Sequence, residues 1–129
     1  CSSDLEDQTA DVDAVSGSFL MMPKAVFRQV GGFDEDYFMY GEDLDLCYRI
    51  KEEGYRVVYF AGASMTHLRG QSGLSSQSKE IIYQFHYAMV LFYQKHLKNK
   101  YNIFVTGAVY AGIWLKYGLT RLKSMLKRG

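Results

Sequence analysis

The sequence has little proline and little cysteine, with one Pro and two Cys among 129 residues. Together with only twelve glycines, this excludes collagen-like and proline-rich chains. Two cysteines cannot form the disulfide framework of a small secreted protein, and Cys47 falls within an expected helix, so a reducing compartment is favoured. Hydrophobic residues at 48% and charged residues at 22% are an ordinary globular composition, which argues against global disorder.

Long hydrophobic runs are also missing, and so are acidic residues in the last third of the chain. The most apolar stretch, residues 103–115, is shorter than the roughly twenty residues that a membrane span needs. Residues 81–129 contain eight Lys or Arg and no Asp or Glu, whereas residues 1–80 contain all fourteen acidic residues. This pattern predicts a helix that lies on an anionic membrane surface or docks on a partner. No nucleic-acid-binding motif accompanies the basic residues, so we expect no nucleic-acid partner.

Hydrophobic periodicity and turn residues divide the chain into short elements. Residues 1–14 are polar and acidic, which is typical of a loop, disordered arm or linker. Strands are expected over residues 15–22, 55–60 and 63–67. Helices are expected over residues 23–30, 42–53, 78–98 and 102–127, with Gly31 and Gly54 as stop signals. The mixture indicates an α/β protein.

Three carboxylates begin the second expected helix: Glu42, Asp43 and Asp45. Crowded carboxylates repel one another, so the pKa of one can rise toward that of a useful general base. Acids in the first turn of a helix also cap free backbone amides and complement the helix dipole. The residues alone leave both interpretations open. Asp45 and Arg49 lie four positions apart on the helix and are expected to form an ion pair.

His67 and the loop after it, residues 68–78, form a second candidate site. A neutral imidazole at the end of an expected strand can bind a divalent metal, although a lone histidine is more often a packed residue. In the loop, Arg69 and several hydroxyls could hold a phosphate. The loop has neither Walker nor Rossmann glycine spacing, so a solvated linker remains the alternative.

The combination of these motifs resembles a known family. One stretch is similar to the C-terminal half of the catalytic domain of family 2 glycosyltransferases, closest to their bacterial rhamnosyltransferase-like branch: VSGSFLMMPKAVFRQVGGFDEDYFMYGEDLDLCYRIKEEGYRVVYFAGASMTHLRGQS. The resemblance implies part of a nucleotide-diphospho-sugar transferase fold of the A type, an α/β sandwich around a mostly parallel sheet. Residues 15–78 would be its acceptor-side half, and residues 79–129 a helical C-terminal extension expected to associate with a membrane.

The resemblance also implies a reaction. Family members transfer a sugar, with inversion, from a nucleotide-diphospho-sugar donor to an acceptor hydroxyl, here expected on a cell-surface glycan or a lipid-linked saccharide. Asp43 matches the family's catalytic base, which deprotonates the acceptor hydroxyl. Glu42 is expected to shape the acceptor site.

Further residues receive substrate roles from the same resemblance. Gly17 and Ser18 lie on the segment that forms the floor of the sugar and acceptor site, and Asp45 joins the expected substrate-binding residues. Arg69 and Ser72 fall on the loop that closes over the donor.

The resemblance places His67 where some members carry a histidine that contacts metal or diphosphate. A divalent cation, Mg²⁺ or Mn²⁺, is therefore expected as the cofactor of the full-length parent. That parent is expected in the cytoplasm, peripheral to the inner face of the cell membrane.

The sequence departs from the family at its N-terminal side. The nucleotide-binding half and its Asp-x-Asp metal motif are not found ahead of residue 15. Asp11-Val12-Asp13 has that spacing but stands where the family has a linker, so we interpret it as coincidence. We therefore expect a fragment that is inactive by itself.

Two alternatives to a transferase remain. A non-catalytic module could use the aromatic helix, with Tyr83, Phe85, Tyr87, Phe92 and Tyr93, for self-association or membrane docking, and a homo-oligomer is compatible with either reading. At helical spacing these aromatic residues are more typical of packing than of a ligand platform. A metal-dependent hydrolase using Asp43 and His67 is the third interpretation, with no further motif to support it.

Overall fold

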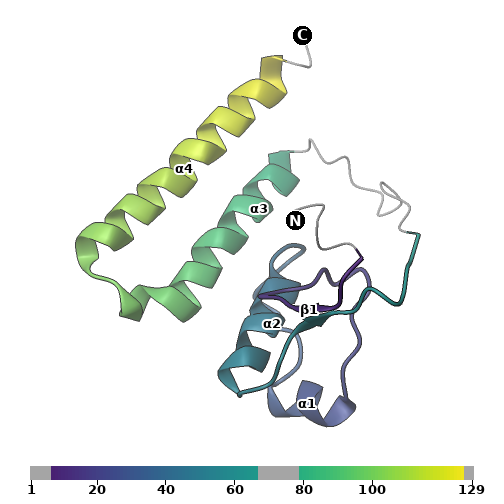
Figure 1. Ribbon diagram of the computed structural model, residues 1–129. Coiled ribbons are helices and arrows are strands. Elements are labelled where there is room, and N and C mark those ends of the chain that lie inside the picture. The colour runs from purple at the N-terminus through teal and green to yellow at the C-terminus, as the bar shows by residue number, and fades with distance from the viewer. Residues whose placement is uncertain (1–6, 67–78, 127–129) are drawn as a thin grey trace. The chain divides into compact units, whose positions relative to one another are not determined.

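The computed structural model describes residues 7–66 and 79–126. The chain divides into two compact units (Figure 1). Residues 7–36 and 42–66 belong to one, called here the N-terminal unit. Residues 37–41 and 79–126 belong to the other, called here the hairpin unit.

Helix α2 (Glu42–Glu52) is the centre of the N-terminal unit. Leu46, Cys47 and Ile50 recur at helical spacing and are buried, together with Val57. Half-buried apolar side chains from the preceding segments pack against this cluster: Val12, Ala14, Val15, Leu20, Met22, Val26, Phe27 and Val30. The unit is therefore organised around one face of one helix.

Helix α1 (Lys24–Gln29) and helix α2 end as the sequence predicts, at glycines. Gly31, Gly32 and Gly54 have φ values of +82°, +74° and +82°, which glycine adopts without steric cost. The Gly32 amide donates to the Phe27 carbonyl at 2.8 Å, and the Gly54 amide donates to the Lys51 carbonyl at 3.0 Å. These bonds satisfy carbonyls that the last helical turn leaves open.

The strand predictions are less accurate than the helix predictions. Among the described residues the sheet has two strands, β1 (Ala10–Asp11) and β2 (Val58–Tyr59), paired antiparallel with Ala10 opposite Tyr59. Strand β1 lies in a segment predicted to be a loop or arm, and β2 is shorter than the expected strand over residues 55–60. The mostly parallel sheet implied by the resemblance is not found among the described residues.

The strand prediction for residues 15–22 is wrong. The segment is irregular, with a turn in which the Phe19 amide donates to the Ser16 carbonyl at 3.3 Å. Val15, Leu20 and Met22 nevertheless pack against the core cluster. A short apolar run indicates that a segment is buried, but it does not show that the segment pairs with another strand, and this explains why a strand was wrongly predicted. Residues 63–66 also form no strand, and His67 lies outside the described residues.

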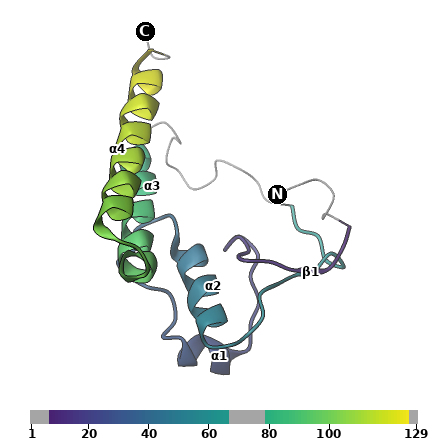
Figure 2. The ribbon, with the colours of Figure 1, turned by 60° about the vertical axis from the view of Figure 1, so that its left-hand side comes forward.

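The hairpin unit consists of two long helices side by side, as Figures 1 and 2 both show. Helix α3 (Lys79–Phe92) continues into a π-helical turn, η2 (Tyr93–Leu97), and a 3₁₀ turn, η3 (Lys98–Lys100). Helix α4 (Ile103–Leu126) then returns along α3. Asn102 caps α4, because its Oδ1 accepts a hydrogen bond from the Val105 amide at 3.0 Å.

Aromatic rings fill the contact between α3 and α4. Tyr83 stands 6.2 Å from Trp114 and 6.1 Å from Tyr117, and His86 is 5.5 Å from Tyr117, between ring centroids. The Tyr93 hydroxyl and the Thr106 hydroxyl are hydrogen-bonded at 3.0 Å, which ties the two helices together near the turn. Tyr83 therefore packs between helices, as its helical spacing predicts.

The remaining part of the hairpin unit is the segment 37–41. Tyr37 is buried and packs with Ala88 and Leu91 of α3. Gly41 has a φ of +89°, and a Cβ there would lie 3.2 Å from the Tyr37 ring.

In the part of the chain that the structure describes, no helix combines the length and apolar character required to cross a membrane.

Candidate active site

The first turn of α2 carries the carboxylates Glu42, Asp43 and Asp45, and the structure separates them into three different environments. Asp43 is half-buried, Asp45 is fully buried, and Glu42 is half-buried with one shielded oxygen. Side chains one and two positions apart on a helix point in different directions, so Asp43 is directed away from both Glu42 and Asp45 despite their proximity in sequence. The three carboxylates have to be considered one at a time.

Asp43 is brought together with Gly17, 26 positions earlier in the chain. The Gly17 amide donates to Asp43 Oδ2 at 2.9 Å, and the Leu44 amide donates to Asp43 Oδ1 at 2.8 Å. One backbone donor on each oxygen fixes the orientation of the carboxylate and leaves further lone pairs on both oxygens. Asp43 is thus held in place while still able to accept a proton.

Gly17 can approach Asp43 closely because it has no side chain. An added Cβ would lie 3.3 Å from the Asp43 Cβ and 3.6 Å from its Oδ2, a tight contact that requires the neighbouring atoms to shift. The structure thus brings Gly17 and Asp43 into contact, while the expected role of Gly17 in the floor of the sugar and acceptor site stays a prediction.

Hydroxyl groups surround Gly17 in the turn. The Ser18 amide donates to Ser16 Oγ at 3.3 Å, and the Ser16 and Ser18 hydroxyls are 3.0 Å apart. Gly17 and both serines are exposed. Ser16 was not predicted as a site residue, although its position beside Gly17 in the quoted motif was the available signal. The turn offers exposed polar groups beside the amide that holds Asp43.

Glu42 has an oxygen without a protein partner. Its Oε2 is shielded from solvent and accepts no hydrogen bond from any described residue. A shielded carboxylate oxygen without a donor is costly, and such atoms are commonly satisfied by water or by a ligand. Glu42 therefore has an acceptor available for a hydroxyl or cation.

Asp45, expected among the substrate-binding residues, lies in a buried ion pair. Its side chain is completely buried and its Oδ2 accepts a hydrogen bond from Arg49 Nε at 2.7 Å, which confirms the expected ion pair. Arg49 Nη1 donates to the Val30 carbonyl and Nη2 to the Gly32 carbonyl, the latter at 2.8 Å. The pair therefore fastens the end of α1 to α2, and this buried position argues against direct contact between Asp45 and a substrate.

The two carboxylates of the Asp-x-Asp sequence, Asp11 and Asp13, each form an ion pair. Arg56 donates to both oxygens of Asp11 at 2.8 Å, and Lys51 Nζ lies 2.5 Å from Asp13 Oδ1. Hydrogen bonding to these cations lowers the pKa of both carboxyl groups below the usual range.

Burial raises the pKa of the Cys47 thiol, so this cysteine is a packed core residue rather than a nucleophile.

Three expected site residues, His67, Arg69 and Ser72, lie outside the described residues. Across residues 7–66 and 79–126, no three His, Cys, Asp or Glu side chains come together as a metal site would require. The described part of the chain thus does not fit a metal centre.

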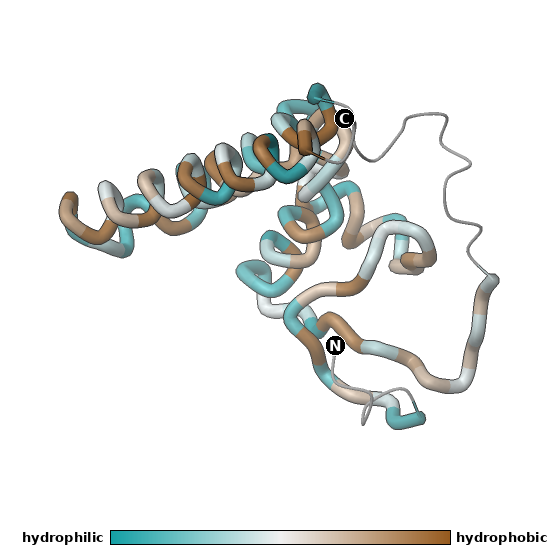
Figure 3. Tube along the Cα trace, turned by 90° about the horizontal axis from the view of Figure 1, so that it is seen from above, coloured by the Kyte–Doolittle hydropathy of each residue, from teal (hydrophilic) through white to brown (hydrophobic). Residues whose placement is uncertain are grey.

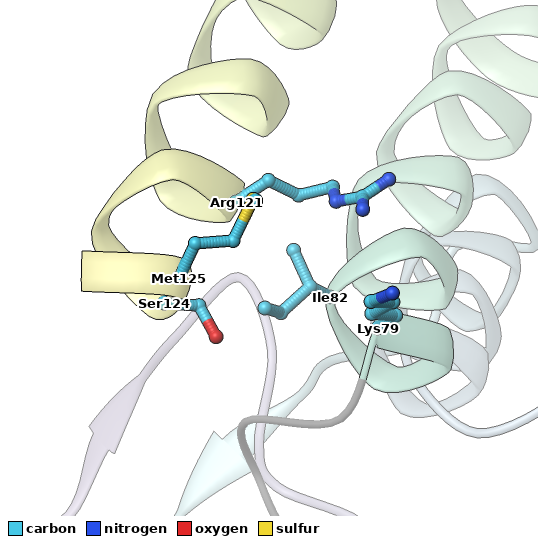
Figure 4. Close-up of a pocket in the computed structure, with 5 residues that line it drawn as sticks. All are labelled: Lys79, Ile82, Arg121, Ser124 and Met125. Carbon is cyan, nitrogen blue, oxygen red and sulfur yellow. The ribbon is translucent and has the colours of Figure 1, made fainter. Parts of the chain in front are cut away.

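A small pocket lies between the start of α3 and the end of α4 (Figure 4). It is lined by Lys79, Ile82, Arg121, Ser124 and Met125 and measures about 20 Å³. That volume holds about one water molecule, so it cannot accommodate a sugar. None of the expected site residues lines it.

Comparisons with known proteins add an independent line of argument. Residues 2–84 match the model of "Glycosyltransferase like family 2". Over 68 residues, the chain is 44% identical to an N-acetylglucosaminyl-diphospho-decaprenol L-rhamnosyltransferase of Mycobacterium tuberculosis and 40% identical to the rhamnosyltransferase WbbL of Escherichia coli. A low-salt glycan biosynthesis hexosyltransferase, Agl10 of Haloferax volcanii, is 36% identical over 52 residues.

These similarities cover only part of each protein. The two rhamnosyltransferase matches take in 53% of this chain but 22% and 26% of the relatives' lengths, and the hexosyltransferase match takes in 40% and 17%. No solved structure is matched. The chain spans about a quarter or less of the length of these curated relatives.

Proposed function

The chain belongs to glycosyltransferase-like family 2, and from this premise we propose that it carries the acceptor side of a sugar transferase. The full-length protein would move a sugar, with inversion, from a nucleotide-diphospho-sugar to an acceptor hydroxyl. The observation that carries the proposal is the half-buried Asp43 carboxylate, held through Oδ2 by the Gly17 amide beside an exposed turn of hydroxyls.

Asp43 acts as the general base in this proposal. As the acceptor oxygen attacks the anomeric carbon, its proton passes to a carboxylate oxygen of Asp43, and the bond from that carbon to the diphosphate oxygen breaks. The amides of Gly17 and Leu44 keep the carboxylate oriented throughout. A positioned base contributes about 10²- to 10⁴-fold to such a step.

Glu42 and Ser18 complete the acceptor site. Glu42, beside Asp43 in the first turn of α2, shapes the acceptor site, and its shielded Oε2 has no donor among the described residues. Ser18, exposed in the turn beside Gly17, contributes a hydroxyl to the floor of the site. Asp45 is a positioning residue that acts through Arg49.

The donor side of the proposal rests on the family alone. Arg69 and Ser72 contact the donor, and His67 contacts its diphosphate or a divalent metal. A divalent cation, Mg²⁺ or Mn²⁺, would supply charge neutralisation for the leaving diphosphate, and His67 is the residue of this chain expected to contact it. The full-length fold is an A-type nucleotide-diphospho-sugar transferase.

The printed names of the relatives suggest where to look for substrates. Two are rhamnosyltransferases, and one of these acts on an N-acetylglucosaminyl-diphospho-decaprenol. We therefore propose a lipid-linked saccharide as the acceptor and rhamnose as the first sugar to test. A lipid-linked acceptor also fits a cytoplasmic enzyme peripheral to the inner face of the membrane.

The decisive variant is Asp43→Asn in the full-length protein that contains this chain. Transfer from a panel of nucleotide-diphospho-sugars, rhamnose included, to a lipid-diphosphate-linked N-acetylglucosamine should fall by at least about 10²-fold in kcat. The loss is expected because an amide cannot accept the acceptor's proton. Asp7→Asn, an exposed carboxamide substitution in the same unit, is the matched control and should leave the rate unchanged.

Two further results complete this test. Donor-dependent thermal stabilisation of Asp43→Asn should equal that of the unaltered protein, since the donor is bound elsewhere. A near-normal turnover number for Asp43→Asn would remove Asp43 as the base.

A second function has its own observation in favour. Phe85 and Tyr87 on α3 remain 45% and 39% exposed, which suits a module that associates with other proteins. Sedimentation equilibrium decides between the two: a ligand-independent oligomer that shows no response to any donor favours the module.

A further inference from the structure

Helix α4 has two apolar sides, and residues of the described part of the chain cover one of them. Thr106, Tyr110, Ile113 and Tyr117 follow one another at three- or four-residue spacing and are buried or half-buried on the α3 side. A second series at the same spacing occupies the opposite side of the helix. This series, called here the outer stripe, consists of Phe104, Ala108, Ala111, Leu115, Leu119 and Leu122.

Every residue of the outer stripe is exposed. Phe104 is 85% exposed, Leu115 66%, Leu119 53% and Leu122 55%. From Phe104 to Leu122 the stripe extends over about 27 Å at the helical rise per residue. Figure 3 shows apolar and polar residues alternating along α4, as expected of a helix with several distinct faces. An apolar surface of this length exceeds what scattered surface leucines produce.

Charge indicates what covers the stripe. Lys116 and Lys123 are exposed, lie seven positions apart and therefore flank the stripe on the same side of α4. The whole segment 81–129 contains eight Lys or Arg and no acidic residue. A second copy would bring the same positive charge to the contact, which disfavours pairing. Anionic headgroups above an apolar layer complement both the lysines and the stripe.

We propose that the outer stripe of α4 lies in the interface of an anionic lipid membrane, parallel to its surface. The leucines and Phe104 enter the boundary between headgroups and acyl chains, and Lys116 and Lys123 contact lipid phosphates. The helix lies on the membrane rather than through it. This inference does not depend on glycosyl transfer, since vesicle binding requires neither donor nor acceptor and is measured separately.

The test is co-sedimentation of the 129-residue chain with vesicles of phosphatidylcholine containing about 30 mol% phosphatidylglycerol. We expect most of the protein in the pellet at about 20 mM NaCl and much less at about 500 mM, since salt screens the lysine–phosphate attraction. Vesicles of phosphatidylcholine alone should bind weakly. Absence of binding to the anionic vesicles at low salt overturns the proposal.

Two pairs of variants locate the contact. Leu115→Gln/Leu119→Gln should weaken the partition coefficient at least about tenfold, because two apolar side chains no longer leave water. The control Phe19→Gln/Met21→Gln removes two exposed apolar side chains of the N-terminal unit and should have no effect. Lys116→Gln/Lys123→Gln should reduce the salt dependence, whereas Lys24→Gln/Arg28→Gln, an exposed pair of equal charge on α1, should not.

The remaining outcomes are equally informative. Circular dichroism should show unchanged helix content for the exposed-site variants, so weak binding cannot be attributed to unfolding. Vesicle binding that survives Leu115→Gln/Leu119→Gln overturns the assignment to the outer stripe. A concentration-dependent dimer that these variants abolish, without vesicle binding, shows that a second copy covers the stripe and also overturns the proposal.

Discussion

The two units of this protein are held together by different kinds of interaction. In the N-terminal unit, ion pairs and backbone contacts fix segments that are distant in sequence: Arg49 with Asp45, Arg56 with Asp11, and Gly17 with Asp43. In the hairpin unit, two helices pack through aromatic and aliphatic side chains. Ion pairs and hydrogen bonds hold individual polar groups at fixed positions. Packing between two helices tolerates substitutions on their outer sides, but it leaves apolar side chains there exposed.

This comparison predicts different sensitivities to substitution. A reacting carboxylate needs its donors at fixed distances, so the N-terminal unit should lose function when one contact is altered. The hairpin unit should accept substitutions on its exposed side with little loss of stability. The outer stripe results from the way the hairpin unit packs, because α3 contacts one side of α4 and the opposite side stays exposed.

The largest expected effect is on the buried ion pair. Arg49→Met should lower the local free energy of unfolding by about 3–5 kcal/mol, because the fully buried Asp45 loses its cation. Amide hydrogen exchange in α2, which reports local opening, is the appropriate measurement. Arg56→Met, which breaks the exposed pair with Asp11, should leave α2 exchange almost unchanged. Equal protection in Arg49→Met and the parent chain would contradict the proposed fastening of α1 to α2.

Glycine-to-alanine substitutions should lower the transfer rate when made in the N-terminal unit and raise the stability when made in the hairpin unit. Gly17→Ala should reduce transfer by the full-length enzyme about tenfold, because its new Cβ displaces the Asp43 carboxylate. Gly107→Ala, in α4 with open space around its Cβ position, should instead stabilise the hairpin unit by about 0.5–1 kcal/mol. Thermal unfolding and single-turnover rates measure the two effects, and a Gly17→Ala enzyme with full activity would be inconsistent with the close approach.

The smallest expected effect is the pH dependence of the β1–β2 contact. The pKa values of Asp11 and Asp13 are lowered in the folded protein, so their stabilisation is complete above the unfolded pKa. It is lost as the pH falls through the lowered folded value, below about pH 4. Both carboxyl groups are exposed, so salt should weaken the effect. The protection factor of the Val12 amide, which donates to the Val57 carbonyl, should fall on acidification in the parent more than in Asp11→Asn/Asp13→Asn.

The helices could be predicted from the sequence because their signals are local. Apolar spacing and the stop glycines Gly31 and Gly54 located α1 and α2 within one or two residues. The strands could not be predicted, because pairing depends on a partner elsewhere in the chain. Two-residue β1 carries no alternating pattern, and its partner β2 lies more than 45 residues later in the chain, with Ala10 opposite Tyr59.

For the candidate site, as for the fold, the local features could be predicted from the sequence and the long-range contacts could not. Residue chemistry alone left Asp43 as either a cap or a base, and only the family resemblance linked it to Gly17. The structure shows the contact between them, 26 residues apart, which neither periodicity nor spacing could give. The local i,i+4 pairing of Asp45 with Arg49 was predicted, but the contacts of Arg49 with the end of α1 were not.

In the proposed reaction, Gly17 contributes by holding the Asp43 carboxylate in place. A double-mutant cycle of Gly17→Ala and Asp43→Asn on the single-turnover transfer rate of the full-length protein tests it most directly. We predict that Gly17→Ala slows transfer in the parent but causes no further loss when Asp43 is already Asn. Multiplicative losses in the double variant would contradict the account, because they would show that the two residues act independently.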